Sequence, residues 1–379
     1  AKGGSGANVT LYAAVAAARL KRMRRYEVHD FPRSKAATKA PPIKTQGIKT
    51  KLIPFIFRSF RWDGEGRWIE PFGGSAVVAF NAAPKRALVA DTNRHIIGFY
   101  EAVRVGQLTP ASVREHLTRE GNILRESGET HYYDVRKRFN ETADPHDFLF
   151  LSRACFNGVM RFNKKGGFNV PFCRKPDRFR QALVTKIVNQ VTWVSSVIRK
   201  GDWEFKVQDW RTTLSQATPA DFMYVDPPYV GRHTDYYNQW SDDEAAALAS
   251  ALKASPAGFA YSMWYENKYR KNTHFDEHFE GFPLALQSHF YHVGSTEDLR
   301  NEMQEALVVS QRHAVTTELM ALRSGDIVIA PASMIEEATT PQKRQIYEAT
   351  GEWPNAKFQP THWMPLPDPP GSTSTQGDR

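Results

Sequence analysis

The residues of greatest chemical interest are Asp226-Pro227-Pro228-Tyr229, which directly follow the apolar run from Phe222 to Val225. The run predicts a short buried strand, and the prolines end it because proline cannot continue a central strand. The tetrapeptide is therefore expected to be a stiff loop at the carboxyl end of a strand, where ligands bind in open α/β sheets. It offers a carboxylate, backbone carbonyls and an aromatic face. Together these groups suit a planar base that carries an exocyclic amine.

Two segments nearer the N-terminus could hold a cofactor. In the first, Gly47 lies between Lys44 and Lys49, so a tight turn between cationic groups could hold a carboxylate. The second lies between an expected strand at residues 67–72 and an expected helix at residues 77–81. Glycines at such a turn let the backbone approach a ligand, and a helix N-terminus favours a carboxylate. Tight packing could also explain the second segment, and a glycine between lysines is common by chance. The residues of the second segment are Glu70, Pro71, Phe72, Gly73, Gly74 and Ser75.

An acidic residue, Asp91, follows a second expected strand at residues 86–90. An acid at the end of the strand after a glycine-rich loop can accept hydrogen bonds from ribose hydroxyls. Asp91 could instead be the N-cap of an expected helix at residues 94–103, or have both roles. A third expected strand, residues 205–210, ends in Asp209 and Trp210.

Residues 106–200 lack the alternation of strands and helices, which indicates a domain inserted into the sheet. Within residues 151–180 there are eight basic side chains and one acid, with aromatic residues between them. The turn signals Asn157-Gly158 and Lys165-Gly166-Gly167 predict a hairpin-like element. Such a surface suits a groove or a phosphate backbone.

The remaining elements are expected to complete an α/β sheet. Strands are predicted at residues 258–263, 290–294 and 306–310, and a capping box predicts a helix at residues 242–254. Residues 230–240 contain Arg232, His233, Tyr236, Tyr237 and Trp240, and could close over a base or be an ordinary surface loop. Residues 1–40 are a basic arm, partly flexible, that either lies along phosphates or is a solvated tail. Residues 311–379 form a C-terminal extension, partly disordered by composition.

The composition limits the class of protein. The formal charge of +9 and the pI near 9.4 suit a nucleic-acid partner, although an uninvolved basic surface would give the same values. Two cysteines cannot make a disulfide framework or a zinc site, and the histidines show no ligand spacing, so no metal is expected. No apolar run approaches the roughly 20 residues that span a bilayer. We therefore expect a soluble, cytoplasmic protein without a membrane partner.

The tetrapeptide from Asp226 to Tyr229 resembles the catalytic motif of the adenine-N6 methyltransferases that use S-adenosyl-L-methionine (AdoMet). The segment from Asn157 to Phe172 closely resembles the target-recognition region of Dam-type DNA adenine methylases. The resemblance covers residues 41–310. It implies a mostly parallel seven-stranded methyltransferase sheet, formed by residues 41–103 and 190–310. It also implies a helical and hairpin DNA-recognition domain, residues 104–189, inserted into that sheet.

The resemblance also implies roles for particular residues. Asp226, Pro227, Pro228 and Tyr229 would be catalytic. AdoMet would be bound by Lys44, Gly47, Lys49, the segment from Glu70 to Ser75, Asp91, Asp209, Trp210 and Asp226. DNA would be bound by Asn157, Arg161, Asn163, Lys164, Lys165 and Asn169, with Arg161 on a base edge or on a phosphate. The chain departs from the family pattern at Thr45, where an aromatic residue is usual, and at Ala76, where a glycine is usual.

The implied function is site-specific methylation of N6 of an adenine flipped out of double-stranded DNA, possibly within a restriction-modification system. The enzyme would act near the nucleoid of a prokaryote or be phage-encoded. Three alternatives stay open at this point. An RNA or free-base methyltransferase would share the pocket, and a cytosine-N4 enzyme would share the chemistry. A DNA-binding module without activity would be consistent with Thr45 and Ala76.

Overall fold

The computed structural model describes residues 38–163, 165–229, 240–267, 270–290, 302–314, 317–321 and 327–331. The chain divides into two compact units. The first contains the sheet, its helices and the chain as far as Ala314. The second contains most of a two-stranded sheet made of β8 (Thr317–Ala321) and β9 (Ile327–Pro331). No helix in the described ranges is long and apolar enough to cross a membrane.

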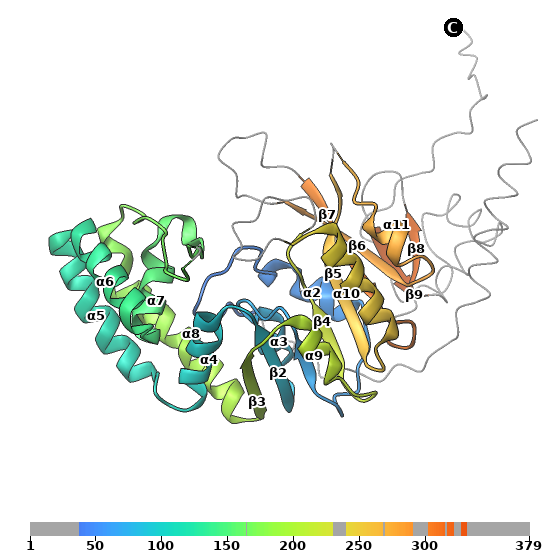
Figure 1. Cartoon of the computed structure of the whole chain (residues 1–379), viewed down its shortest axis with the longest axis horizontal. Helices are drawn as coiled ribbons and strands as arrows, with labels where there is room; N and C mark the ends of the chain where they lie inside the picture. The colour runs from blue at the N-terminus through green and yellow to red at the C-terminus, as the bar shows by residue number, and fades with distance from the viewer. Residues whose placement is uncertain are drawn as a thin grey trace, which may run out of the picture. The chain divides into compact units, whose positions relative to one another are not determined.

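A seven-stranded sheet of order β3-β2-β1-β4-β5-β7-β6 forms the centre of the first unit (Figure 1). Strands β1 to β5 pair in parallel, and β7 lies antiparallel between β5 and β6. This confirms the expected α/β fold with a mostly parallel seven-stranded sheet. The strands are β1 (Trp68–Glu70), β2 (Arg86–Asp91), β3 (Asp202–Val207), β4 (Phe222–Val225), β5 (Gly258–Asn267), β6 (Leu284–Phe290) and β7 (Glu302–Val309).

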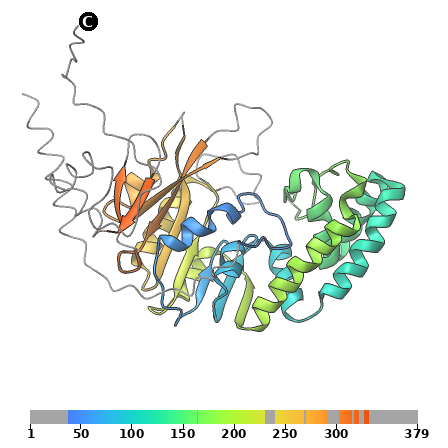
Figure 2. The same ribbon diagram turned by 180° about the vertical axis from the view of Figure 1, so that it is seen from behind.

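Helices cover both faces of the sheet, and the side chains of β4 alternate between two cores. Phe222 and Tyr224 belong to the core under α2, α3 and α4, whereas Met223 and Val225 belong to the core under α9, α10 and α11. Figures 1 and 2 show α10 and α2 on opposite sides of the sheet. The helices are α2 (Ile53–Arg58), α3 (Val77–Ala82), α4 (Arg94–Arg104), α9 (Trp210–Ser215), α10 (Asp242–Ala254) and α11 (His274–His278), with 3₁₀ turns Thr50–Leu52 and Gln311–His313.

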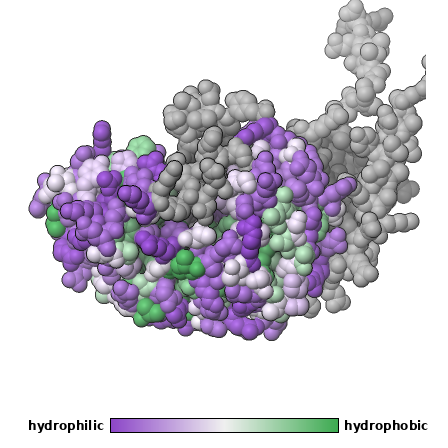
Figure 3. All heavy atoms as spheres, viewed as in Figure 1, coloured by the Kyte–Doolittle hydropathy of each residue, from purple (hydrophilic) through white to green (hydrophobic). Residues whose placement is uncertain are grey.

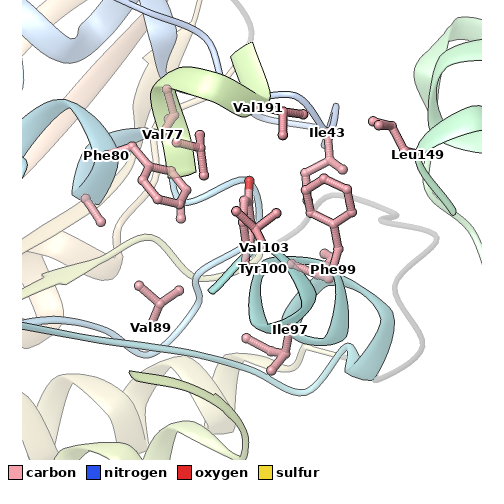
Figure 4. Close-up of a cluster of buried hydrophobic side chains, with 14 of the residues drawn as sticks. Ile43, Val77, Phe80, Val89, Ile97, Phe99, Tyr100, Val103, Leu149 and Val191 are labelled. Carbon is pink, nitrogen blue, oxygen red and sulfur yellow. The ribbon is translucent and has the colours of Figure 1, made fainter. Parts of the chain in front are cut away.

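Four long helices form a group between α4 and β3. They are α5 (Pro110–Ser127), α6 (Glu129–Thr142), α7 (Pro145–Ala154) and α8 (Gln181–Arg199), with 3₁₀ turns Phe156–Gly158 and Pro176–Phe179. Helix α4 packs on both α7 and α8. Figure 4 shows how Phe99 and Tyr100 of α4 lie near Val77, Leu149 and Val191, so one core joins this helical group to the sheet.

The structure corrects two expected strand boundaries. The sixth strand ends at Phe290, where the sequence analysis placed the start of a strand, and residues 291–301 lie outside the described ranges. Strand β3 ends at Val207, and Asp209 and Trp210 instead begin helix α9. The expected domain boundary between residues 189 and 190 falls inside α8.

Candidate active site

The expected site residues from β1, β2 and β4 meet at one edge of the sheet. Strands β1 and β4 are neighbours and run parallel, so their following loops leave the same edge. The crossovers change direction between these strands, which is the usual ligand site in open α/β sheets. The glycine-rich loop and the Asp226 loop therefore lie at the switch point.

The glycine loop after β1 approaches the neighbouring strand too closely for a side chain. A Cβ atom on Gly73 would lie 2.5 Å from Val89 Cγ1, and its N–H donates to the Ala90 carbonyl at 2.7 Å. Gly74 has φ +47°, and its N–H donates to Asp91 Oδ2 at 2.9 Å. On the other side, the Tyr100 hydroxyl donates to the Ser75 carbonyl at 2.6 Å. The loop is thus held from both sides, with Gly73 buried and Gly74 half-buried.

Asp91 supports this loop and is not the N-cap of α4. The cap is Asn93, whose side chain accepts from the N–H groups of His95 and Ile96. The second oxygen of Asp91 accepts from Asn93 N–H at 2.8 Å. The N-cap alternative for Asp91 was therefore wrong. The ribose role stays a prediction, since each carboxylate oxygen can accept more than one hydrogen bond.

Ala76, where the family usually has glycine, has a left-handed backbone with φ +51°. Glycine adopts this conformation without strain, whereas an L-residue costs about 1–2 kcal/mol. The Ala76 methyl is buried in the core under α3, with 1% of the residue exposed. It therefore does not line the open edge of the sheet.

Glu70, at the end of β1, is a buried acid beside the catalytic loop. Its side chain accepts from the Trp68 indole N–H at 3.0 Å, and 2% of the residue is exposed. Burial, with a smaller contribution from the nearby Asp226 charge, raises the pKa of Glu70 to about 8. The carboxyl is therefore largely protonated at neutral pH.

Asp226 forms an ion pair with Lys49, whose Nζ lies 2.9 Å from Asp226 Oδ1. Only 3% of the Lys49 side chain and 21% of the Asp226 side chain are exposed. Gly47 makes the turn that allows this, with φ +72° and its carbonyl 3.2 Å from Lys49 Nζ. Burial raises the pKa of Asp226 to about 6, while Lys49 opposes the rise. Lys49 thus contacts Asp226, where the sequence indicated a cofactor carboxylate as its partner.

Tyr229 is the last residue of the tetrapeptide that begins at Asp226. Lys49 Nζ lies 4.9 Å from the centroid of its ring. The Tyr229 hydroxyl donates to Glu305 Oε2 of β7 at 2.6 Å. Pro227 is buried and Pro228 is half-buried, so the backbone between the acid and the ring is packed. The sequence analysis missed Glu305, although a lone acid beside the apolar run 306–309 is a signal that could have found it.

The other expected cofactor residues lie around this edge. Phe72 packs edge-on against Trp240, with ring centroids 5.4 Å apart. Pro71 is buried beside it. Asp209 caps α9 by accepting from Arg211 N–H at 2.7 Å. Trp210 is 5% exposed and its indole N–H donates to Glu244 of α10, so it packs in the core between these helices. The AdoMet-binding role of this pair stays a prediction.

The expected recognition segment forms an irregular hairpin with bridges Cys155↔Phe172 and Phe162↔Phe168. Asn163 makes its turn by accepting from the N–H groups of Lys165 and Gly167 at 2.9 and 3.0 Å. Arg161 donates from Nε to Asn169 Oδ1 at 3.0 Å, so two of the expected DNA-binding residues hold each other. Lys165 is exposed, and Lys164 lies outside the described residues.

Lys44 faces this hairpin rather than Asp226. A Cβ atom on Gly158 would lie 3.0 Å from Lys44 Cδ. Burial, then the charges of Arg153 and Arg178, lower the pKa of Lys44. Burial also lowers the pKa of Arg153 to about 10. None of these three cations forms an ion pair with a carboxylate within the described part of the chain, so the base of the hairpin attracts anions. The sequence analysis missed this cluster because its members come from distant segments.

The 3₁₀ turn Phe156–Gly158, at the base of the hairpin, carries two exposed side chains. Asn157 has φ +53°, and Phe156 is 53% exposed. Figure 3 shows a mostly hydrophilic described surface on which hydrophobic side chains are isolated. Among the described residues, no group of three or more His, Cys, Asp or Glu side chains is arranged to bind a metal ion.

The sheet order, the glycine loop after β1 and the acid–aromatic loop after β4 define an α/β methyltransferase that acts on an amino group. Comparison with known families agrees with this class. Residues 46–293 match the model of the D12 class N6 adenine-specific DNA methyltransferases. Because the match covers more than half of the chain, the chain belongs to this family of DNA adenine-N6 methyltransferases.

Curated relatives are similar over much of the chain. The DNA adenine methylase of Vibrio cholerae is 27% identical over 285 residues, which are 72% of this chain and 96% of the relative. A type II methyltransferase of Lactococcus lactis subsp. cremoris is 30% identical over 200 residues, 50% of this chain and 66% of the relative. The DNA adenine methylase of Escherichia coli is 31% identical over 194 residues, 48% of this chain and 64% of the relative.

Proposed function

We propose that this enzyme methylates N6 of an adenine flipped out of double-stranded DNA at one specific sequence, with AdoMet as methyl donor. The observation that supports the proposal most is the convergence of Asp226, Lys49 and Tyr229 at the edge of the sheet where the glycine loop after β1 also lies. Asp226 and Tyr229 suit a planar base that carries an amine, and the glycine loop suits a cofactor with an amino-acid part.

The residues at the sheet edge fit AdoMet. Gly73 lets the loop pass close over β2, Gly74 turns the chain with a left-handed backbone, and Asp91 is anchored beside them. We assign the cofactor to these residues together with Ser75, Glu70 and Asp226. AdoMet, when bound, supplies an electrophilic methyl group. A cationic cofactor would favour the ionised forms of the two buried acids, Glu70 and Asp226, whose pKa values are raised in its absence.

The catalytic loop would stabilise the charge that develops on the amine. Adenine N6 is a poor nucleophile because its lone pair is delocalised into the ring. Hydrogen bonds from N6–H to the Asp226 carboxylate and the Pro227 carbonyl would favour a pyramidal nitrogen and offset its growing positive charge. Asp226 need not remove a proton first, since the charge appears only as the methyl is transferred.

The base must leave the helix to reach this loop. Flipping costs a few kcal/mol, and stacking on Tyr229 would recover on the order of 1–3 kcal/mol. In the structure the Lys49 ammonium lies over that ring, so an arriving base replaces a cation–π contact with a stacking contact.

Residues 104–189 are proposed as the DNA-recognition domain, beside a catalytic domain of residues 41–103 and 190–310. The support is the basic hairpin, in which Arg161 is held by Asn169 and Lys165 is exposed. Arginine bidentate to guanine is the commonest specific contact in the major groove. To contact a base edge, Arg161 would have to break its hydrogen bond to Asn169 or use guanidinium N–H groups that Asn169 does not occupy.

The test exposes unmethylated genomic DNA to the purified protein and AdoMet, then maps modified bases by single-molecule sequencing. The expected result is N6-methyladenine at one recurring motif, absent with Asp226→Ala. Lys85→Ala, at the opposite edge of the sheet, is the matched control and should keep wild-type activity. Methylation without a recurring motif would reject site specificity, and duplex binding without methylation would reject the catalytic proposal.

The type II name of the Lactococcus relative supports a place in a restriction-modification system, in the cytoplasm of a prokaryotic or phage-infected cell. The test is whether an endonuclease from the same genome cuts the mapped motif only when it is unmethylated. A genome that carries the methylated motif but no such endonuclease would instead indicate a solitary methyltransferase.

A further inference from the structure

Glu305 is a buried carboxylate of β7 that contacts the catalytic loop. Its exposed fraction is 1%, and it accepts the Tyr229 hydroxyl at 2.6 Å. The next four residues of the strand, 306–309, are all buried and hydrophobic. A carboxylate among apolar side chains costs desolvation free energy, so core packing does not account for an acid at this position.

The strand register places Glu305 level with the catalytic loop. Val225, the last residue of β4, pairs with Tyr261 of β5, and Tyr261 pairs with Val308 of β7. Glu305 pairs with Trp264, three residues further along β5 in the direction of Asp226. At roughly 3.3 Å per residue this is about 10 Å beyond the end of β4. Glu305 of β7 therefore reaches the loop that follows β4, although β5 lies between these two strands in the sheet.

We propose that Glu305 is a positioning residue that fixes the Tyr229 ring for stacking on the target adenine. This rests on the proposed function, because Glu305 acts at the same site through Tyr229. The Tyr229 hydroxyl donates to Glu305 Oε2 at 2.6 Å, and a hydrogen bond to a carboxylate is about twice as strong as one between neutral groups. Such a bond restrains the ring at the end opposite to its backbone.

The bond also affects the charge of the ring. A carboxylate that accepts a hydrogen bond from the phenol polarises the O–H bond, which increases the electron density of the ring. The face of the ring becomes more negative as a result. Positive charge develops on the adenine only in the transition state, and a negative face stabilises that state more than the bound substrate. Glu305 should therefore contribute to kcat and little to KM for DNA.

Glu305 has a second effect that a structural residue would not have. Its charge is among the causes that raise the pKa of Asp226, after burial. Removing the charge while keeping the shape should lower the pKa of Asp226. The acid limb of the pH–rate profile would then move to lower pH.

The test compares Glu305→Ala, Glu305→Gln, Tyr229→Phe and the double variant Tyr229→Phe/Glu305→Ala on duplex DNA that contains the mapped motif. We expect Glu305→Ala and Tyr229→Phe each to lower kcat about 10- to 100-fold, the loss expected for a hydrogen bond to a charged group. The double variant should lose no more than either single variant. Glu305→Gln keeps an acceptor, so it should lose less in kcat while shifting the acid limb to lower pH. Gln304→Ala, on the other face of β7, is the control.

The outcomes separate the two proposals. A folded wild-type enzyme that does not methylate adenine rejects the proposed function. An active wild type with unchanged kcat in Glu305→Gln and Glu305→Ala rejects the role of Glu305, as do losses that add in the double variant. If Glu305→Ala does not fold, Glu305→Gln decides by its pH profile: an unmoved acid limb rejects the inference.

Discussion

At the scale of single residues, the ionisation of Asp226 depends on two neighbours of opposite charge. Burial is the main cause that raises its pKa to about 6, Lys49 lowers it and Glu305 raises it. A pKa near 6 leaves the carboxylate ionised at physiological pH, where it can accept hydrogen bonds from an amine. It also leaves the group protonated under mildly acidic conditions.

The first prediction is therefore an acid limb in the rate of methylation. The acid form of Asp226 cannot offset charge on N6, so kcat/KM for DNA should fall about tenfold per pH unit below about pH 6. Initial rates between pH 5 and 8 measure this, with DNA binding checked at each pH. A flat profile down to pH 5 would contradict an essential carboxylate with this pKa.

The second prediction concerns Lys49. Lys49→Met removes the ammonium that lowers the pKa of Asp226, so the acid limb should move to higher pH. The same pH series measures the shift, and Lys51→Met, an exposed lysine two residues away, is the matched control. A limb that stays in place would show that the ion pair does not persist in the enzyme that enters the reaction.

The third prediction is that Glu70 makes the fold less stable as the pH rises from about 4.5 to about 8. Its pKa is raised by folding, so the native state holds the proton more tightly than the unfolded chain. Stability is fully present below about pH 4.5 and falls as pH rises towards about 8, by up to about 1.4 kcal/mol per unit. Urea unfolding at pH 6 and pH 8 measures the slope. Glu70→Gln keeps the acceptor for Trp68 and should flatten it, whereas an equal slope in the variant would assign the loss to other groups.

The tetrapeptide from Asp226 to Tyr229 could be singled out from the sequence as a candidate site because its functional groups are contiguous. Strand, carboxylate, prolines and ring follow one another between Phe222 and Tyr229. The partners of those groups could not be identified in this way. Lys49 reaches Asp226 through a turn at Gly47, and Glu305 reaches Tyr229 through the register of β5 and β7. Neither relation is encoded in local spacing.

At the scale of secondary structure elements, Gly73 and Gly98 differ in whether the structure has room for a side chain. Gly73 lies where β1 turns over β2, and a Cβ atom there would clash with Val89. Gly98 is exposed in the middle of α4, and a Cβ atom there would meet no atom within 4 Å. The first glycine is needed for a close approach, whereas the second only weakens a helix.

The fourth prediction follows from this pair. Gly73→Ala should destabilise the fold by about 1–3 kcal/mol through overpacking and should weaken AdoMet binding. Gly98→Ala should raise the free energy of unfolding by up to about 1 kcal/mol, because alanine favours a helix interior. Urea unfolding and a calorimetric AdoMet titration measure both effects. Equal effects of the two substitutions would contradict the packing described for the glycine loop.

Local signals predicted most of the elements around the site. The capping box gave α10 at Asp242–Ala254, and the apolar run before the prolines gave β4 at Phe222–Val225. The signals failed where tertiary pairing decides the end of an element. Strand β5 continues to Asn267 because β7 pairs with it beyond the end of β4, and β6 lies earlier than expected because its partner is β7.

At the scale of the whole molecule, the structure shows where some of the basic residues behind the net charge of +9 are concentrated. Lys44, Arg153 and Arg178 gather at the base of the basic hairpin without a carboxylate partner in the ranges that the structure describes. Net charge alone left open whether the basic residues are merely solvated. Their clustering away from acids favours a phosphate backbone, which attracts cations in proportion to the charges neutralised.

The fifth prediction is a salt-dependent affinity for duplex DNA. The logarithm of the binding constant should fall linearly with the logarithm of salt concentration, and Lys165→Ala should reduce the slope by about 1 if its ammonium neutralises a phosphate. Fluorescence anisotropy over a salt series measures this. Lys85→Ala, at the amino end of β2, should leave the slope unchanged. Equal slopes for wild type and Lys165→Ala would remove Lys165 from the DNA interface.

The contact between α4 and α8 has a consequence for how such enzymes diversify. The chain leaves the sheet through α4 and returns to it through α8, and these two helices lie side by side (Figure 1). The segment between them therefore begins and ends at the same place on the sheet. The segment between α4 and α8 can therefore become longer or shorter, or be replaced, without a change in the order of the strands. A lineage could thus acquire a new target sequence by exchanging one cassette, while the chemistry at the sheet edge is inherited intact.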